Sequence, residues 1–81
     1  MKTYELIVKK DKQYGLDKSL YVMGRIVGIL EGSGAGVMYN TFQMNVKYPM
    51  RISFMADKDQ IDRIKTAITK SYSYMVDIVK Y

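Results

Sequence analysis

The side chains that carry out most protein chemistry are missing from this sequence, which contains neither histidine nor cysteine. Zinc, haem and iron–sulfur sites therefore lose their usual ligands, and catalytic triads built on histidine are excluded. The eight acidic residues are scattered and show no calcium-loop spacing, so we expect no metal and no other cofactor. Glu5 and Asp77 are the acids best placed for catalysis, but they have no histidine to work with. We therefore predict that the protein is not an enzyme.

Alternating glycines at positions 32, 34 and 36 form the one run that resembles a nucleotide-binding loop. Phosphate-binding loops place their glycines after a strand and before a helix, so that the phosphate meets a helix N-terminus. Here the glycines follow a predicted helix and precede a predicted strand, and no Gly-Lys-Ser/Thr sequence follows them. The run therefore predicts a flexible connection.

The charge balance is basic, with 13 lysines and arginines against eight acids and a net charge of +5. Cations that contact phosphates and aromatic rings that stack on bases are how single-stranded nucleic acid is bound. The basic residues are dispersed, however, and solubility is the commoner reason for such a charge. Nucleic-acid binding is therefore the alternative function. Its candidate residues are Lys9, Lys10, Lys12, Tyr39, Lys47, Tyr48 and Arg51.

The first half of the chain has the pattern strand–helix–strand. Alternating apolar residues predict a strand over residues 3–9. Asp17 is suited to cap a helix that runs to about residue 30, and Gly32 to end it. The apolar stripe predicted to face the core comprises Leu16, Leu20, Met23, Val27 and Leu30. A strand over residues 37–46 follows, with Phe42, Met44 and Val46 on the face expected to meet the core.

The second half has the pattern strand–helix–strand again, after a short turn at residues 47–49. Alternation predicts a strand over residues 50–56. Asp57 and Gln60 form a capping-box pattern at the start of a helix, whose apolar residues recur at helical spacing. These residues are Ile61, Ile64, Ile68 and Tyr72. A last strand covers residues 75–81.

This order of elements resembles the ferredoxin-like α/β plait over essentially the whole chain. The resemblance implies one α+β domain over residues 1–81, with a four-stranded antiparallel sheet and both helices on one face. The first and third strands would be central. The likeness is one of topology alone, and this fold carries too many functions to name one.

Two surfaces are predicted to contact a partner. The first is the outer face of the first helix, where the core stripe leaves apolar residues over and where Gly24 and Gly28 cost about 1 kcal/mol each relative to alanine. Its candidate residues are Tyr21, Val22, Arg25 and Ile29. The second is the open face of the sheet, with an apolar centre and a rim formed by Glu5, Lys9, Gln43, Arg51 and Asp77. Its candidate residues are Ile7, Met55, Val79 and Tyr81.

Together these patterns predict a small interaction or regulatory module that self-associates or binds another protein. RNA-binding plaits carry aromatic residues on the central strands of the open face, whereas Ile7 and Met55 occupy those positions here. Apolar stretches fall short of the ~20 residues that cross a bilayer, so no membrane partner is expected. No signal-peptide pattern precedes the first strand, and a cytoplasmic location is therefore expected.

Overall fold

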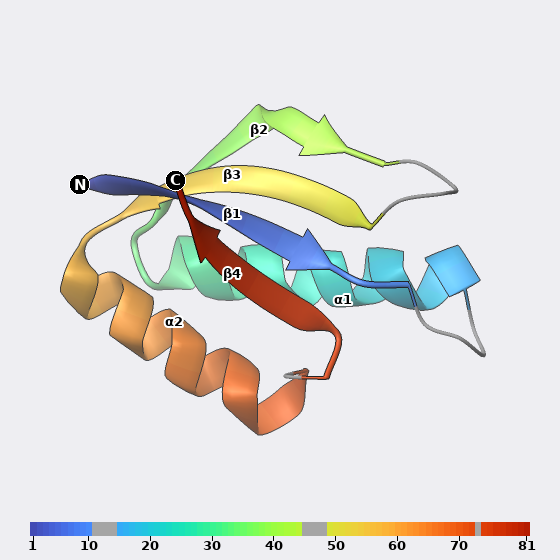
Figure 1. The fold of residues 1–81 in the computed structure, drawn as a ribbon. Coiled ribbons are helices and arrows are strands. Elements are labelled where there is room, and N and C mark those ends of the chain that lie inside the picture. Colours follow the sequence, from blue (N-terminus) through green and yellow to red (C-terminus); the bar gives the residue numbers. More distant parts are fainter. Residues whose placement is uncertain (11–14, 45–48, 73) are drawn as a thin grey trace.

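A computed structural model describes residues 1–10, 15–44, 49–72 and 74–81, with the side chain of Leu16 also outside the description (Figure 1). The six predicted elements are present in the predicted order. They are β1 (Lys2–Val8), α1 (Gly15–Gly32), β2 (Gly36–Gln43), β3 (Met50–Ala56), α2 (Lys58–Ser71) and β4 (Val76–Lys80). Within the described residues, neither α1 nor α2 is long and apolar enough to pass through a bilayer.

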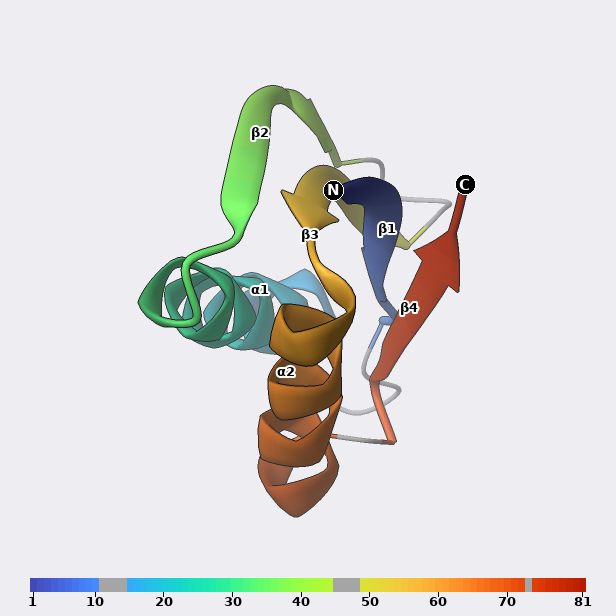
Figure 2. The same cartoon turned by 90° about the vertical axis from the view of Figure 1, so that its left-hand side faces the viewer.

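The four strands form one antiparallel sheet in the order β2-β3-β1-β4, so β1 and β3 are central as predicted. The register places Tyr4 of β1 opposite Phe54 of β3 and Lys80 of β4. Both helices cover the same face of this sheet, and its other face is open (Figure 2). The structure is therefore a two-layer α+β fold with an uncovered sheet surface.

The core lies between the covered sheet face and the helices, where the predicted alternation is confirmed. Leu6, Val8 and Phe54 are fully buried, and the Tyr4 and Phe54 rings stack with centroids 5.6 Å apart. The apolar stripe of α2 supplies its three buried isoleucines, Ile61, Ile64 and Ile68, as predicted.

The connection between α1 and β2 lies against the start of α2. The Asp57 backbone N–H donates to Gln60 Oε1 at 2.8 Å, as the predicted capping box requires. Gly34 has a φ of +83°, and a Cβ there would lie 3.0 Å from Gln60 Nε2. The backbone conformation therefore favours glycine at this point, and a Cβ there would also require the Gln60 side chain to shift slightly.

The orientation of α1 corrects the sequence-based prediction. Its buried residues are Ser19, Val22, Met23, Ile26 and Leu30. Leu20, predicted in the core, is 45% exposed, whereas Val22, predicted on the outer face, is 0% exposed. At 100° per residue the buried stripe is rotated by about 60° from the predicted one. A polar residue, Ser19, takes part in that stripe because its hydroxyl donates to the Lys9 carbonyl oxygen at 2.9 Å.

Strand β2 is shorter and less regular than predicted. It ends at Gln43, and its pairing with β3 shifts between Met38 and Gln43 through a bulge. Within the bulge the Thr41 hydroxyl accepts from the Ser53 N–H at 2.8 Å and donates to the Met38 carbonyl oxygen at 2.6 Å. The bulge breaks the period-2 alternation, so the prediction that Phe42 and Met44 face the core is wrong, and both are exposed. Val46 lies outside the described residues.

Candidate interaction surfaces

The two acids considered for catalysis are both held in ion pairs on the open face of the sheet. The Glu5 carboxylate lies 3.5 Å from the Arg51 guanidinium, and the Asp77 carboxylate lies 3.2 Å from the Lys9 ammonium. No group of three or more acidic residues within the described ranges could hold a metal ion. The chemistry that these side chains offer is therefore mutual charge neutralisation across neighbouring strands.

Strand pairing brings residues that are distant in sequence into one row across the open face. Glu5 lies opposite Ser53 of β3 on one side and Val79 of β4 on the other, and Met38 of β2 continues the row beyond Ser53. Because β1 and β3 are central, the polar pair of Glu5 and Ser53 occupies the middle of this face.

A hydrogen-bond network fills that middle row. The Tyr81 hydroxyl donates to Glu5 Oε2 at 2.9 Å, and the Ser53 hydroxyl lies 3.2 Å from the same tyrosine oxygen. The single phenolic proton goes to Glu5, so the Ser53 hydroxyl is the donor to Tyr81. Arg51 binds the other oxygen of Glu5. These four side chains are thus linked to one another, and Ser53 is only 6% exposed.

The predicted apolar centre of the open face is corrected by this network. Glu5 was expected on the rim, but it lies in the middle, because it pairs with Ser53 and reaches Tyr81. The apolar candidates surround it. Ile7 and Met55 are half-buried, whereas Val79 is 48% exposed and Tyr81 is exposed. The open face is therefore an internally connected polar centre flanked by apolar side chains.

The outer face of α1 is less apolar than predicted. Tyr21 and Arg25 are exposed there as expected, but Val22 is in the core and Ile29 is half-buried against it. The surplus apolar surface on which this prediction rested is thus largely absorbed by the core. What remains exposed is the neighbouring pair of Leu20 and Tyr21.

The two helical glycines of α1 lie beside a groove. Added Cβ atoms at Gly24 and Gly28 would meet no other group of the described chain within 4 Å. The glycines line a depression together with Arg25 and Ile29 of the same helix, and with Ser71 and Tyr72 at the end of α2. No element of the described chain approaches these glycines closely.

The residues proposed for nucleic-acid binding are not brought into one free basic patch by the described structure. Lys9 and Arg51 are engaged with carboxylates on the open face. Lys10 is exposed at the end of β1, and Tyr39 is exposed on β2 at one edge of the sheet. The remaining candidates, Lys12, Lys47 and Tyr48, lie outside the described residues.

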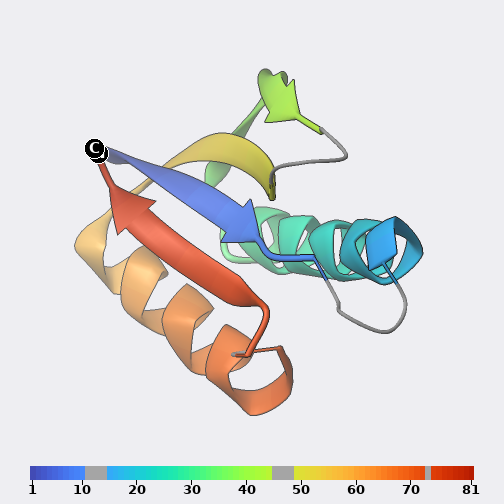
Figure 3. The ribbon, with the colours of Figure 1, turned by 45° about the vertical axis from the view of Figure 1, so that its right-hand side comes forward.

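A surface that sequence reasoning missed lies between α2 and β4, which run side by side at the other edge of the sheet (Figure 3). A groove of about 200 Å³ opens between them. Its lining residues are Lys65, Ile68, Thr69, Val76, Asp77 and Ile78. No motif marks this groove, because its residues come from two elements whose separate patterns describe only helix and strand.

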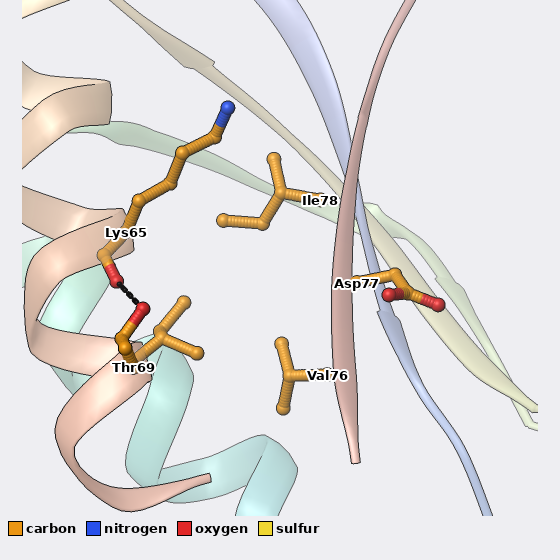
Figure 4. Close-up of a pocket in the computed structure, with 6 residues that line it drawn as sticks. Lys65, Thr69, Val76, Asp77 and Ile78 are labelled. Carbon is orange, nitrogen blue, oxygen red and sulfur yellow. Dashed lines mark hydrogen bonds between the residues drawn. The ribbon is translucent and has the colours of Figure 1, made fainter. Parts of the chain in front are cut away.

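The groove is lined mainly by apolar side chains and by one lysine, Lys65. Val76 and Ile78 point from β4 toward α2, whereas Asp77 points to the opposite side of the strand (Figure 4). The Thr69 hydroxyl donates to the Lys65 carbonyl oxygen at 2.8 Å, so its hydrogen-bond donor is used within the helix. The Lys65 side chain extends along the groove toward Ile78 (Figure 4). The groove therefore combines an aliphatic floor with an ammonium group.

Comparison with protein-family models, with curated proteins and with solved structures finds no match to this chain. No function can thus be transferred from a relative. The function must be argued from the open sheet face, the outer face of α1 and the groove between α2 and β4.

Proposed function

We propose that this protein is a non-enzymatic protein-interaction module that self-associates through the open face of its sheet. The observation that carries the proposal is the network of Glu5, Arg51, Ser53 and Tyr81 in the middle of that face. Covering polar groups with a partner is costly where they lose water and gain nothing in return. Here the polar groups already have partners within the same protomer, which lowers the cost of covering them.

The apolar side chains around the network supply the driving force. Val79 is 48% exposed on an edge strand, and Met38, Met55 and Ile7 are half-buried around the polar row. Apolar area removed from water contributes about 25 cal/mol per Å². A second copy that brings the same face would cover these side chains on both protomers, which is the arrangement of a twofold symmetric dimer.

The outer face of α1 supports a smaller part of the proposal. Leu20 and Tyr21 remain exposed beside the groove at Gly24 and Gly28, so a partner protein could contact them. This surface lacks the preformed polar network of the open sheet face. We therefore assign self-association to the sheet and leave the outer face of α1 as the second candidate contact.

The test compares two lysine substitutions at equally exposed apolar positions. Val79→Lys places a charge on the open sheet face, and Leu20→Lys places the same charge on α1, where the side chain is 45% exposed. Molar mass is measured by light scattering and by sedimentation from low to high micromolar concentration. We expect wild type and Leu20→Lys to exceed the 9.4 kDa of one chain, and Val79→Lys to associate at least about tenfold more weakly, since like charges would face each other.

Three results would contradict the proposal. A wild-type mass of 9.4 kDa at every concentration would exclude self-association. Dissociation by Leu20→Lys in place of Val79→Lys would assign the interface to α1. The nucleic-acid alternative would be favoured if a monomeric protein were retained on single-stranded RNA at low salt and its affinity fell steeply as salt rose.

We further propose that the fold is a variant of the ferredoxin-like α/β plait. The element order, the all-antiparallel pairing and the central position of β1 and β3 support this assignment. The bulged pairing of β2 with β3 is its main irregularity. An experimental structure in which either helix crosses to the open face of the sheet would overturn it.

A further inference from the structure

The outer edge of β4 is open for hydrogen bonding, and the register identifies the residues that present it. The Lys9 N–H donates to the Met75 carbonyl oxygen at 2.7 Å, and the Tyr81 N–H donates to the Thr3 carbonyl oxygen at 3.1 Å. Backbone groups alternate in direction along an antiparallel strand. Met75 and Tyr81 therefore turn their backbones toward β1, and so do the odd-numbered residues between them.

The even-numbered residues of β4 consequently turn their N–H and C=O groups away from the sheet. These are Val76, Ile78 and Lys80. β4 is the last strand in the sheet order, so no described strand pairs with them. Unpaired strand edges are templates for the addition of another strand. The side chains of Val76 and Ile78 point into the groove beside α2, so the open hydrogen bonds and the apolar groove lie at the same place.

The charges at the mouth of this groove are positive. Lys65 extends along the groove toward Ile78, and Lys80 is the next residue after Ile78 on that side of β4. Lys80 is also close to Lys2, whose side-chain hydrogen bond and positive charge lower the pKa of Lys80. None of these three lysines takes part in an ion pair within the described chain.

The acids nearest to the groove are directed elsewhere. Asp77 points to the other face of β4 and pairs with Lys9 there. Asp62 lies one turn before Lys65, and it lines a separate depression on α2 with Arg63, Thr66, Ala67 and Lys70. The volume of the α2–β4 groove, about 200 Å³, is below the 300–1,000 Å³ that is typical of small-molecule pockets. It suits one or two side chains of a peptide.

We propose that an extended segment of a partner protein, with an apolar residue and an acidic residue two positions apart and so on the same face, binds here as a fifth strand along β4. Its backbone pairs with Val76, Ile78 and Lys80, one apolar side chain packs on the groove floor, and a carboxylate meets the ammonium groups of Lys65 and Lys80. Main-chain bonds supply affinity in this mode of binding, and the groove and charges supply selectivity. This site is distinct from the open sheet face that we propose for self-association.

The test uses a short synthetic peptide that carries valine and glutamate in turn at every second position, with threonine at the positions between them, so that both face the groove. It is titrated into the ¹⁵N-labelled full chain. Strand addition predicts an alternating response along β4, with larger amide shifts and slower amide exchange at Val76, Ile78 and Lys80 than at Asp77 and Val79. The Lys65→Glu variant is expected to bind about fivefold more weakly, which is the scale of one surface ion pair. Lys58→Glu, on the same helix away from the groove lining, is the matched control and should bind as wild type does.

Two altered peptides separate this mode from other kinds of binding. N-methylation of alternate amides should abolish binding in one register and spare it in the other, because only one set of amides faces β4. A peptide with lysine in place of glutamate should bind at least about fivefold more weakly. Each of three results would overturn the proposal. They are equal binding of the glutamate and lysine peptides, amide shifts confined to the open sheet face, and no amide shift at millimolar peptide. These results do not depend on the molar-mass test of self-association.

Discussion

The orientation of α1 can be tested by a pair of substitutions for which the sequence pattern and the structure predict opposite results. The structure buries Val22 completely and leaves Leu20 45% exposed. The periodicity of the sequence alone predicts the reverse. Val22→Ala and Leu20→Lys therefore act on the same helix, two positions apart, and only one of them should cost stability.

The magnitudes follow from the groups removed. Val22→Ala deletes two buried methyl groups worth about 0.8 kcal/mol each, and the cavity left behind adds to the loss. Alanine returns about 0.5 kcal/mol through its higher helix propensity. The expected net loss in the free energy of unfolding is about 1.5–2.5 kcal/mol. Leu20→Lys keeps an aliphatic stem on the surface, with its charge in water, and should change stability by less than about 0.5 kcal/mol.

The assay is thermal and urea denaturation followed by circular dichroism, at low micromolar concentration so that self-association does not contribute. For a chain of 81 residues, each kcal/mol lowers Tm by about 4–8 °C. Val22→Ala should therefore lower Tm by about 6–20 °C, and Leu20→Lys by less than about 4 °C. A larger loss for Leu20→Lys than for Val22→Ala would show that the sequence-based stripe is right and that α1 is rotated in the structure.

Two further predictions concern the bulge and the paired lysines. Thr41→Val leaves the N–H of the buried Ser53 without its acceptor and should lower the free energy of unfolding by about 1–3 kcal/mol. The control, Thr66→Val at an exposed position, should change it by less than about 0.5 kcal/mol. Equal urea midpoints for the two variants would contradict the role of Thr41 in stabilising the bulge. Lys2 lowers the pKa of Lys80 from its usual 10.5, first through a side-chain hydrogen bond and then through charge repulsion. The free energy of unfolding should therefore rise with pH between the folded-state pKa of Lys80 and 10.5. Lys2→Gln should restore the pKa of Lys80 in an NMR titration and remove this rise, and an unchanged pKa would refute the coupling.

Elements with a strong and unbroken period could be predicted from sequence. In α2 the isoleucines recur on one stripe, the opposite face is charged, and Gln60 marks the start, so position and orientation are both fixed by local information. β1 alternates in burial, and β3 does so apart from the buried Ser53, because one face of each strand packs against the helices. In these segments local pattern and tertiary packing agree.

α1 could be located but not oriented from sequence, since its apolar side is wider than one core stripe. Leucine, valine and isoleucine are spread over about half of its circumference, and several stripes within that half are almost equally apolar. In the structure the stripe that includes Ser19, Val22 and Ile26 is buried, and the Ser19 hydroxyl donates to the carbonyl oxygen of Lys9. A buried serine lowers the apparent hydrophobicity of the stripe that is used, which is why the pattern favoured the wrong one.

The candidate surfaces were predictable only in part, for a related reason. Alternation placed Val79 and Tyr81 on the open face correctly, but it could not show that Tyr81 reaches across to Glu5 and Ser53. That network depends on the register of three strands. The groove beside α2 likewise depends on which strand is last in the sheet, a property of topology that no single segment carries.

Strand β4 links the two proposed surfaces. Among its odd-numbered residues, Val79 places its side chain on the open sheet face. Its even-numbered residues are Val76, Ile78 and Lys80, whose backbone groups form the open edge, and the side chains of Val76 and Ile78 line the groove. A peptide added along that edge would widen the sheet by one strand and so enlarge the face through which two copies meet. Any effect of binding at one surface on affinity at the other must then be the same factor in both directions. The glutamate–valine peptide should therefore strengthen self-association if its side chains on the open face contact the second copy, and weaken it if they collide with that copy. A self-association constant that is unchanged by saturating peptide would mean that the two surfaces are independent.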